Sequence, residues 1–387
     1  MSTEGHEELR DGTRAFLNAR SPSAAVRTLM DSGIGYDRDV WHQMATELGL
    51  HGIAIPREFG GAGASMAELS IVFEEMGRSL LCAPFFATVG LAAHAIVTSG
   101  DDAAMARVLP AIADGSTIAT LILNGELGPF DASSVTLAAR RDGAAYEIDG
   151  TAAMVLDGHV ADVILLAART DAGISLFMVD AAAAGLYRER KDTLDRTRKI
   201  AELRFDRVSA HLIGIDGGAE PGLRTTSDLA IVALTAEQVG GAQRCQDMAV
   251  DYAKQRVQFG RAIGSFQAVK HRCADMLVRV ESARSAAMHA AGCGAGDELA
   301  TAASVAKLYC SEAFLSAATD NMRIHGGVGF TWEHDAHLYF RRAKASQHLL
   351  GSPRLHANRL AQFVDDGTIG PSKLARRTLQ PVQGAIT

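Results

Sequence analysis

Two segments in the last third of the sequence carry residues that could bind an anionic ligand with an aromatic part. The segment RVQFGRAIGSFQ contains Arg256, Phe259 and Gln267, and the segment IHGGVGF contains Gly326 and Gly327. A guanidinium offers paired donors to a phosphate, and a phenyl ring and an amide can contact the rest of the ligand. Glycine lacks a side chain, so the backbone there can approach a ligand closely. The alternative is that these residues only terminate helices, with Arg256 in a salt bridge.

Long helices are expected to position these residues. Residues 222–364 are rich in Ala, Leu and Met, and glycine-containing breaks at 259–260, 292–296 and 326–327 divide them into four helices. Four helices joined by short loops predict an antiparallel four-helix bundle. Residues 365–387 combine prolines with polar residues, and we expect them to form a mobile tail.

The rest of the chain divides into two regions with different patterns of apolar residues. Residues 1–115 show apolar residues at helical spacing and predict an N-terminal helical domain. Residues 116–221 consist of short apolar runs separated by turn residues, and they predict a β-barrel-like middle domain. Within it, RRDGAAYEIDG is typical of a hairpin, because Asp-Gly readily supplies positive φ. The predicted fold class is therefore α+β multidomain.

Composition excludes several classes of protein. The chain has 387 residues, a net charge of −7 and a pI near 6.0, which gives no support to binding nucleic acid or an anionic membrane. Eight basic residues lie within 187–207, but five acids interleave with them, so we expect a solvated strand-and-loop surface. Five scattered cysteines indicate reduced thiols inside the cell. The polar N-terminus and the lack of an apolar run of ~18 residues predict a cytoplasmic protein with no membrane span.

The order of helices, strands and helices resembles the acyl-CoA dehydrogenase family. The similarity covers residues 5–363, and WHQMATELGLHGIAIPREFGGAG, LDRTRKIAELRFDRV, RVQFGRAIGSFQAVKHRCADM and HGGVGFTWEHD carry it. It implies an FAD-dependent oxidoreductase that dehydrogenates the α,β carbons of an acyl-CoA in fatty acid or sterol breakdown. It also implies that residues at the end of the bundle hold the FAD of a neighbouring subunit; these are Arg256, Phe259, Gln267, Gly326, Gly327 and Arg323, the last standing where the family usually has glutamine.

The resemblance also shows where the chain departs from the family. A dehydrogenase of this kind needs a carboxylate to remove the α-proton while the flavin accepts hydride. Leu350 stands at the usual position of this base and Ala230 at the alternative one, and neither can accept a proton. Asp228 and Glu237 are nearby carboxylates, but two residues turn a helix by about 200° and seven residues move about 10 Å along it. The catalytic base is therefore unknown.

The middle domain departs from the family as well. The elements that face the flavin correspond to LNGELGPFDASS, where only Asn124, Glu126 and the Ser133-Ser134 pair are polar candidates. The residues that cover one flavin face correspond to AMVLDG. Met154 and Val155 in that segment could pack on the ring, but the usual hydroxyl and large aromatic side chain are absent. The chain's own FAD site is predicted to be altered.

The departures from the family pattern mainly affect the residues for the chain's own FAD rather than those for a partner's FAD. Residues directed at a partner's FAD are kept, so the leading hypothesis is a non-catalytic half-site subunit of a heteromeric acyl-CoA dehydrogenase, such as a heterotetramer. The alternatives are a self-sufficient homo-oligomer with a displaced base, and a flavin-free scaffold or regulatory protein. No metal site is expected, because His325, His334 and His337 fit the opening of a family helix.

Overall fold

The N-terminal region of the computed structural model is helical, as predicted, and the structure describes residues 3–124, 128–143 and 145–368. Local signals fix the starts of its helices: Asp37 accepts backbone N–H bonds at the start of α3, and Ser65 and Glu68 form a capping box at α4. The elements are α1 (Thr3–Arg20), α2 (Ser23–Asp31), α3 (Arg38–Thr46), η1 (Leu50–Gly52), η2 (Arg57–Phe59), α4 (Met66–Ser79), the π-helical η3 (Phe86–Ala93), α5 (His94–Ser99) and α6 (Asp102–Ala113).

The middle region is a sheet that closes on itself. Strands β2, β3, β7, β5 and β4 pair in that order, and β4 returns to β2 through one parallel pair, Ala138 with Arg169. Strand β1 adds to β4, and β6 adds to β7, so the predicted barrel-like domain and its Asp142-Gly143 hairpin are confirmed. The elements are β1 (Ala119–Ile122), η4 (Ala132–Ser134), β2 (Ala138–Asp142), β3 (Ala145–Leu156), β4 (Val163–Thr170), β5 (Gly173–Asp180), β6 (Leu186–Lys191) and β7 (Ile200–Ile213).

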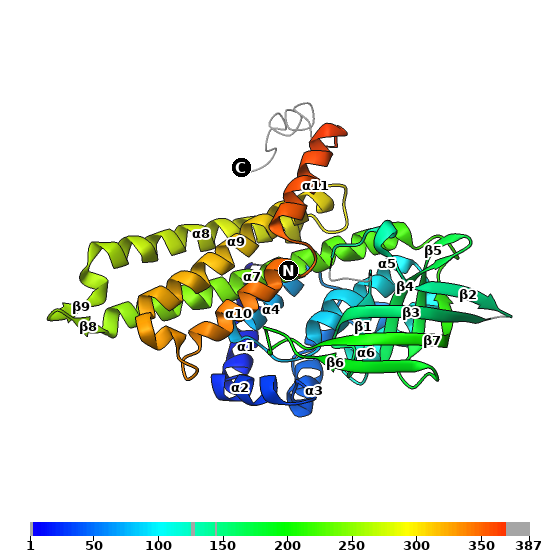
Figure 1. Cartoon of the computed structure of the whole chain (residues 1–387), viewed down its shortest axis with the longest axis horizontal. Helices are drawn as coiled ribbons and strands as arrows, with labels where there is room; N and C mark the ends of the chain where they lie inside the picture. The colour runs from blue at the N-terminus through cyan, green and yellow to red at the C-terminus, as the bar shows by residue number, and fades with distance from the viewer. Residues whose placement is uncertain (1–2, 125–127, 144, 369–387) are drawn as a thin grey trace, which may run out of the picture.

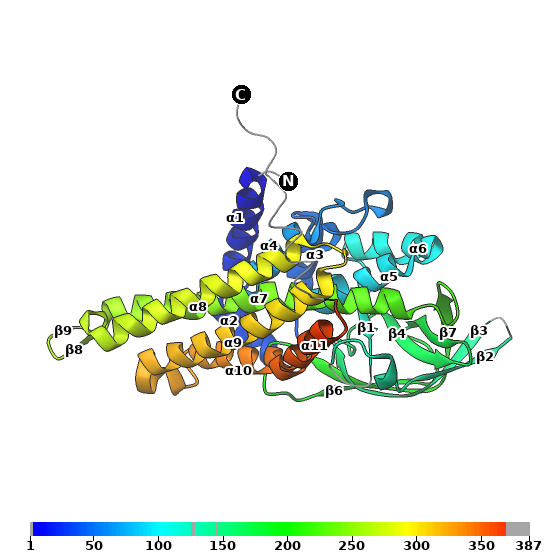
Figure 2. The ribbon, with the colours of Figure 1, turned by 90° about the horizontal axis from the view of Figure 1, so that it is seen from above.

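The C-terminal region is the predicted helical bundle, built around α7. This helix runs the length of the molecule from the barrel to a small hairpin at the far end, and it is buried along most of its course (Figures 1 and 2). The elements are α7 (Glu220–Gln255), β8 (Val257–Gln258), β9 (Arg261–Ala262), η5 (Ile263–Ser265), α8 (Gln267–Gly292), α9 (Leu299–His325), η6 (Gly326–Phe330), α10 (Ala336–His348) and α11 (Pro353–Asp365).

The predicted domain limits of 1–115, 116–221 and 222–364 stay predictions. Helix α6 ends at Ala113 before β1 begins at Ala119, and α7 begins at Glu220, two residues earlier than the predicted start of the bundle. The predicted tail, 365–387, lies mostly outside the described residues. Among the described residues, no helix has the length and apolar character needed to cross a membrane. None of the five cysteines, all within the described residues, is in a disulfide bond.

One prediction about the surface is wrong in part. The basic segment 187–207 was expected to be solvated, but Asp195 and Arg198 turn inward toward the bundle, and Lys199 turns inward toward α2. Lys199 donates its Nζ proton to the carbonyl of Met30 at 2.7 Å. These side chains belong to a buried group of charges between the barrel and the bundle. Their inward direction could not be read from the charge pattern, because alternating charges look the same on either face.

Candidate functional site

The predicted ligand-binding residues lie together at the narrow end of the bundle. Helix α7 ends there, α8 begins there, and the antiparallel α9 ends there. The ring of Tyr252 on α7 stacks on His325 at the end of α9, with centroids 4.3 Å apart. Asp320 on α9 accepts from Arg272 on α8 at 2.7 Å and pairs with Arg323 at 3.5 Å. These contacts fix the three helix ends relative to one another.

The side chains at this end point into solvent. Arg256 and Gln267 are exposed, Phe259 is 91% exposed, and the side chain of Arg323 is 62% exposed. A salt bridge within the chain does not account for Arg256, which has no ion pair among the described residues. The guanidinium of Arg256, the phenyl ring of Phe259 and the amide of Gln267 thus face outward from one surface.

The glycine pair leaves room beside these side chains. Gly326 has φ 64° and ψ −140°, a backbone conformation open essentially to glycine alone. A Cβ built on Gly326 or Gly327 would meet no atom within 4 Å, so the backbone at these two residues faces open space. A planar or anionic group of another molecule can therefore lie directly against this backbone.

The tip of the β8–β9 hairpin holds an exposed phenyl ring at a backbone conformation that disfavours a bulky side chain. Phe259 and Gly260 both have positive φ, 54° and 77°, as a two-residue hairpin turn of type I′ requires. Asn or Gly is the usual first residue of such a turn, and a bulky side chain there is an outlier that costs on the order of 1 kcal/mol. A residue kept against local preference at a tip is a sign of function.

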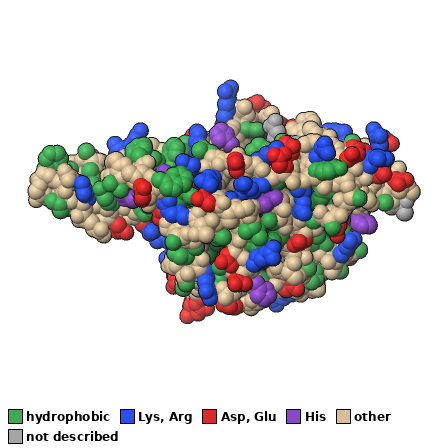
Figure 3. All heavy atoms as spheres, turned by 60° about the horizontal axis from the view of Figure 1, so that its bottom comes forward, with side chains coloured by type: hydrophobic (Ala, Val, Ile, Leu, Met, Phe, Trp, Pro, Cys, Tyr) green, Lys and Arg blue, Asp and Glu red, His purple; other side chains and the backbone are tan. Residues whose placement is uncertain are grey.

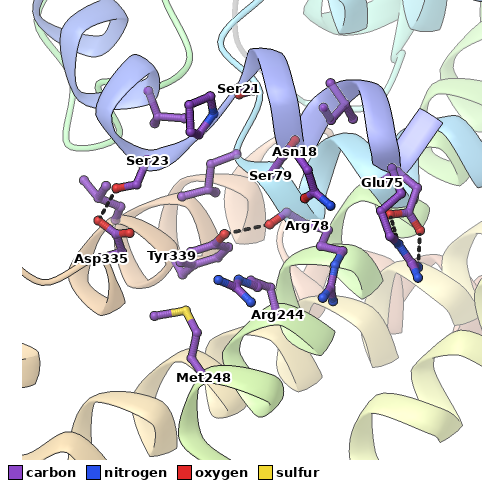
Figure 4. A pocket seen from close by; sticks show the side chains of 16 residues that line it. Asn18, Ser21, Ser23, Glu75, Arg78, Ser79, Arg244, Met248, Asp335 and Tyr339 are labelled. Atoms are coloured by element: carbon purple, nitrogen blue, oxygen red, sulfur yellow. Dashed lines mark hydrogen bonds and ion pairs between the residues drawn. The ribbon is translucent and has the colours of Figure 1, made fainter. Parts of the chain in front are cut away.

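The N-terminal domain braces the loop that follows the glycines. Asp335 accepts from Ser23 at 2.6 Å and from Arg27 at 2.8 Å, and Arg27 also donates to the carbonyl of Trp332 at 2.7 Å. Behind this contact lies a cavity of about 270 Å³ between α1, α4, α7 and α10 (Figure 4). In it, Tyr339 donates to the carbonyl of Arg78 at 2.6 Å. Helix α2 thereby positions η6 and the start of α10.

The three histidines near this loop pack against other rings. The rings of His325 and His334 lie 4.3 Å apart, and His337 stacks on Trp332 at 4.8 Å. Burial lowers the pKa of all three imidazoles, which favours their neutral form. They therefore help to shape the end of the bundle rather than adding charge to it.

The positions expected for the catalytic base are filled by packed apolar side chains. Leu350 and Ala230 are both fully buried. A Cβ on the neighbouring Gly351 would meet Pro129 at 3.1 Å, and the N–H of Phe130 donates to Ser227 at 2.9 Å. The segment expected to face a flavin therefore packs directly on α7 and on the turn that contains Leu350.

The other polar candidates of the middle domain make hydrogen bonds to residues close to them in the sequence. Asn124 donates to the carbonyl of Pro129 at 2.6 Å, and the hydroxyls of Ser133 and Ser134 donate to Asp131. Glu126 lies outside the described residues. In the AMVLDG segment Val155 is buried and Met154 is exposed. Met154 and Val155 supply neither the hydroxyl nor the large aromatic ring that the family places over one flavin face, and the hydroxyls of Ser133 and Ser134 are bonded to Asp131, so the described part of the middle domain departs from the family's flavin site.

Both carboxylates considered as substitute bases are held in ion pairs. Glu237 accepts from Arg342 at 2.7 Å and from Arg198 at 2.5 Å, and Asp228 accepts from Arg359 at 2.5 and 2.9 Å. Burial raises the pKa of Glu237, but the two arginines more than offset it, and the pKa ends below its ordinary value. A carboxylate with reduced proton affinity and occupied oxygens is a poor general base.

The buried charges around Arg342 were not predicted from the sequence. Arg342 also donates to Asp195 at 2.7 Å and to the hydroxyl of Thr197 at 2.6 Å, which links α10 to the segment before β7. Burial raises the pKa of the nearby Asp157 to about 7, although Arg198, Arg342 and Lys199 oppose the shift. An acid such as Glu237 within the apolar run LAIVALTAEQVGG was the one signal that a buried partner had to exist.

The arrangement of N-terminal helices, barrel and bundle is that of the acyl-CoA dehydrogenases, and comparison with known proteins agrees. Residues 3–116 match the acyl-CoA dehydrogenase N-terminal domain, and residues 229–364 match the C-terminal domain. The chain is 35% identical to acyl-CoA dehydrogenase IpdE2 of Mycolicibacterium smegmatis over 94% of this chain and 99% of the relative. The chain therefore belongs to the acyl-CoA dehydrogenase family, whose flavin-dependent members oxidise a CH–CH bond of an acyl-CoA.

Two solved structures are similar over nearly their whole length. One is a variant of the Tcur3481-Tcur3483 steroid acyl-CoA dehydrogenase, with 33% identity, a TM-score of 0.85, and coverage of 94% of this chain and 99% of that chain. The other is the ChsE4-ChsE5 complex from Mycobacterium tuberculosis, with 28% identity, a TM-score of 0.86, and coverage of 94% and 98%. Both names describe assemblies of two different proteins.

Proposed function

We propose that this chain is the non-catalytic subunit of a heteromeric acyl-CoA dehydrogenase and completes the FAD site of a partner subunit. One contrast carries the proposal. The cluster at the end of the bundle is exposed, whereas Leu350 and Ala230 are buried and the Pro129-Phe130 part of the flavin-facing segment packs on α7 and on the Leu350 turn. A chain with this distribution can give binding groups to a neighbour's cofactor without using one of its own.

In this role each group at the narrow end has a task. Arg256 would donate to the pyrophosphate of FAD, and Phe259 would cover an apolar part of the cofactor. Gln267 and Arg323 would bond its polar atoms, and the backbone at Gly326-Gly327 would allow close approach. The flavin would supply hydride acceptance, and the partner would supply the carboxylate base and the thioester pocket.

The relatives support a sterol-derived or fatty acyl-CoA as the substrate of the complex. One similar structure is named as a steroid dehydrogenase, and both similar structures are of two-protein assemblies. The acyl-binding residues of the complex would come mainly from the partner, because the junction of this chain's own barrel and bundle is filled by the Arg342 cluster.

The proposal is tested on the complex isolated through a tag on this chain. We expect one co-purifying chain of the same family, bound FAD, and bleaching of the flavin by an acyl-CoA. Arg256→Ala should lower the flavin content of the complex at least about tenfold under dilution, since a charged bidentate contact is worth roughly 1.5–3 kcal/mol. Arg107→Ala is the matched control, because Arg107 is exposed on α6 near the opposite end of the molecule (Figure 1).

Two results would contradict the proposal. The first is tight, stoichiometric FAD on the chain expressed alone, with acyl-CoA-dependent bleaching that Glu237→Gln or Asp228→Asn abolishes. That outcome would identify a self-sufficient enzyme with a displaced base. The second is a complex whose flavin content and turnover are the same with Arg256→Ala as with Arg107→Ala, which would favour a flavin-free scaffold.

A further inference from the structure

The turn between α8 and α9 brings together three different metal-ligating side chains that the proposed function does not use. His289 lies in the last turn of α8, Cys293 caps that helix, and Glu298 precedes α9. One potential ligand atom from each residue lies within 4.8 Å of the other two. The three border an open hollow of about 570 Å³, where His289 and Glu298 are exposed and Cys293 is half-buried.

The backbone of the turn holds the three residues in this arrangement. His289 and Cys293 are four residues apart, so they lie on the same face of the helix end. Gly294, with φ 56°, reverses the chain, and Gly296 donates its N–H to the carbonyl of Cys293 at 3.3 Å. Leu299 donates to Gly296 at 3.0 Å, which returns Glu298 to the side of the first two residues. The cluster is therefore produced by a closed turn and not by three long side chains that happen to meet.

The donor set has a definite chemistry. Imidazole nitrogen, thiolate sulfur and carboxylate oxygen are the three ligand types of zinc in proteins, with bonds of about 2.0–2.3 Å. Tetrahedral bonds of that length place neighbouring ligand atoms about 3.5 Å apart, so small side-chain rotations would bring the observed cluster into range. The carbonyl end of α8 and the neighbouring Asp297 add negative potential beside it. A hard cation such as Mg²⁺ would not select the thiol.

We propose that His289, Cys293 and Glu298 form a binding site for a divalent transition metal, with Zn²⁺ as the best match, which clips the end of α8 to the start of α9. Three protein ligands leave a fourth position for water. Binding replaces the Sγ–H proton of Cys293 with a sulfur–metal bond, and the proton goes to solvent, so affinity falls as the pH is lowered. The site lies at the end of α8 opposite Gln267, and it is independent of the flavin proposal.

Cobalt provides a direct test on the full chain. The reduced, chelator-treated protein should bind one Co²⁺, with a sulfur-to-cobalt charge-transfer band in the near ultraviolet that added Zn²⁺ removes. Cys293→Ser should abolish the band. His289→Ala and Glu298→Gln should each weaken binding by at least about 10–100-fold, the loss typical even of outer-shell partners. Cys273→Ser is the matched control, because Cys273 is another half-buried thiol on α8.

The variants and controls distinguish metal binding at this site from metal binding at another thiol and from a loss of folding. Circular dichroism of each variant checks that the helices are intact, and the exposed Glu298 gives a variant with little effect on packing. Absence of the band in the native chain, or an equal band in Cys293→Ser, overturns the proposal. Loss of the band in Cys273→Ser, with Cys293→Ser unaffected, would assign the metal to a different thiol and would overturn it as well.

Discussion

At the scale of single residues, the narrow end of the bundle and the junction of barrel and bundle differ in what surrounds each charge. Arg256 at the narrow end has no ion-pair partner within the described part of the chain. Arg342, between barrel and bundle, is buried and bonds to Asp195, Thr197 and Glu237. An exposed charge is available to a ligand, whereas a buried and fully bonded charge serves the fold. The difference in burial therefore supports the proposed binding role of the first arginine and a stabilising role of the second.

Glu237→Gln should destabilise the chain by about 3 kcal/mol, because it removes the carboxylate paired with Arg198 and one of the two carboxylates paired with Arg342 in a buried setting. Urea denaturation of both proteins measures this change. Glu189→Gln is the control: the Glu189 side chain is 71% exposed, and its loss should cost less than about 0.5 kcal/mol. Equal losses in the two variants would show that the buried pairing contributes nothing.

The Glu237 effect should also depend on pH. Its pKa is lowered in the folded chain, so its contribution is present above the unfolded-state value near 4.5 and is lost as the pH falls below it. The stability difference between the native chain and Glu237→Gln should therefore shrink in acid. A difference that stays constant from pH 7 to pH 4 would contradict the assigned ionisation.

The contribution of Asp157 to stability should change with pH in the opposite direction to that of Glu237. Burial raises its pKa to about 7, so the folded chain holds a proton that the unfolded chain releases above about pH 4. Stability linked to this group is present below the unfolded pKa and is lost as the pH rises toward 7, by roughly 2 kcal/mol between pH 5 and pH 8. Asp157→Asn should remove that loss, because an amide side chain does not ionise. The substitution should fit the backbone, since Asn tolerates the φ of 51° at this position.

Thermal unfolding at a series of pH values measures the Asp157 effect. The exposed Asp171→Asn serves as control and should leave the pH profile unchanged. If the profile of Asp157→Asn kept the same decline toward pH 8 as the native chain, the buried carboxyl would not be its source.

At the scale of elements, the β8–β9 hairpin should show a conflict between stability and binding. Phe259→Asn places a favoured residue in the type I′ turn and should stabilise the chain by about 0.5–1 kcal/mol. The same change should increase the loss of FAD from the complex, because the exposed ring is removed. Denaturation of the chain and flavin content of the complex measure the two effects, and unchanged flavin retention would remove Phe259 from the proposed site.

The elements also show how far the sequence could predict the structure. Glycines and the Phe-Gly pair interrupt long apolar helices, so the ends of the bundle followed from local signals, whereas the gathering of Arg256 with Gly326 was implied by the resemblance to the family. Asp-Gly and short apolar runs predicted the barrel. The Arg342 cluster could not be predicted, because Asp195 and Arg342 are 147 residues apart. Local periodicity carries no information about such a distant pair.

At the scale of the whole molecule, the narrow end carries an apolar surface that indicates an interface. Figure 3 shows hydrophobic side chains there, and the exposed residues include Val257, Phe259, Val328, Phe330 and Trp332. Phe330→Ser should weaken association with the partner at least tenfold, since burying a Phe side chain stabilises by roughly 1.5–3 kcal/mol. Val364→Ser on α11 is the control, because Val364 is 58% exposed at another surface. Analytical ultracentrifugation compares the two, and equal association would place the interface elsewhere.

The distribution of sites over the molecule also predicts how much flavin the assembly holds. This chain offers one exposed set of groups for a neighbour's cofactor, and its own flavin-facing segment packs on α7 and the Leu350 turn. The partner should supply the pocket and this chain the outer contacts, so each pair of subunits should contain one FAD rather than two. Native mass spectrometry, together with flavin absorbance per protein, gives the ratio. Two FAD per pair of subunits would mean that the packed junction opens to admit a cofactor. One FAD per pair whose retention is unchanged by Arg256→Ala would place that cofactor beyond the reach of this chain.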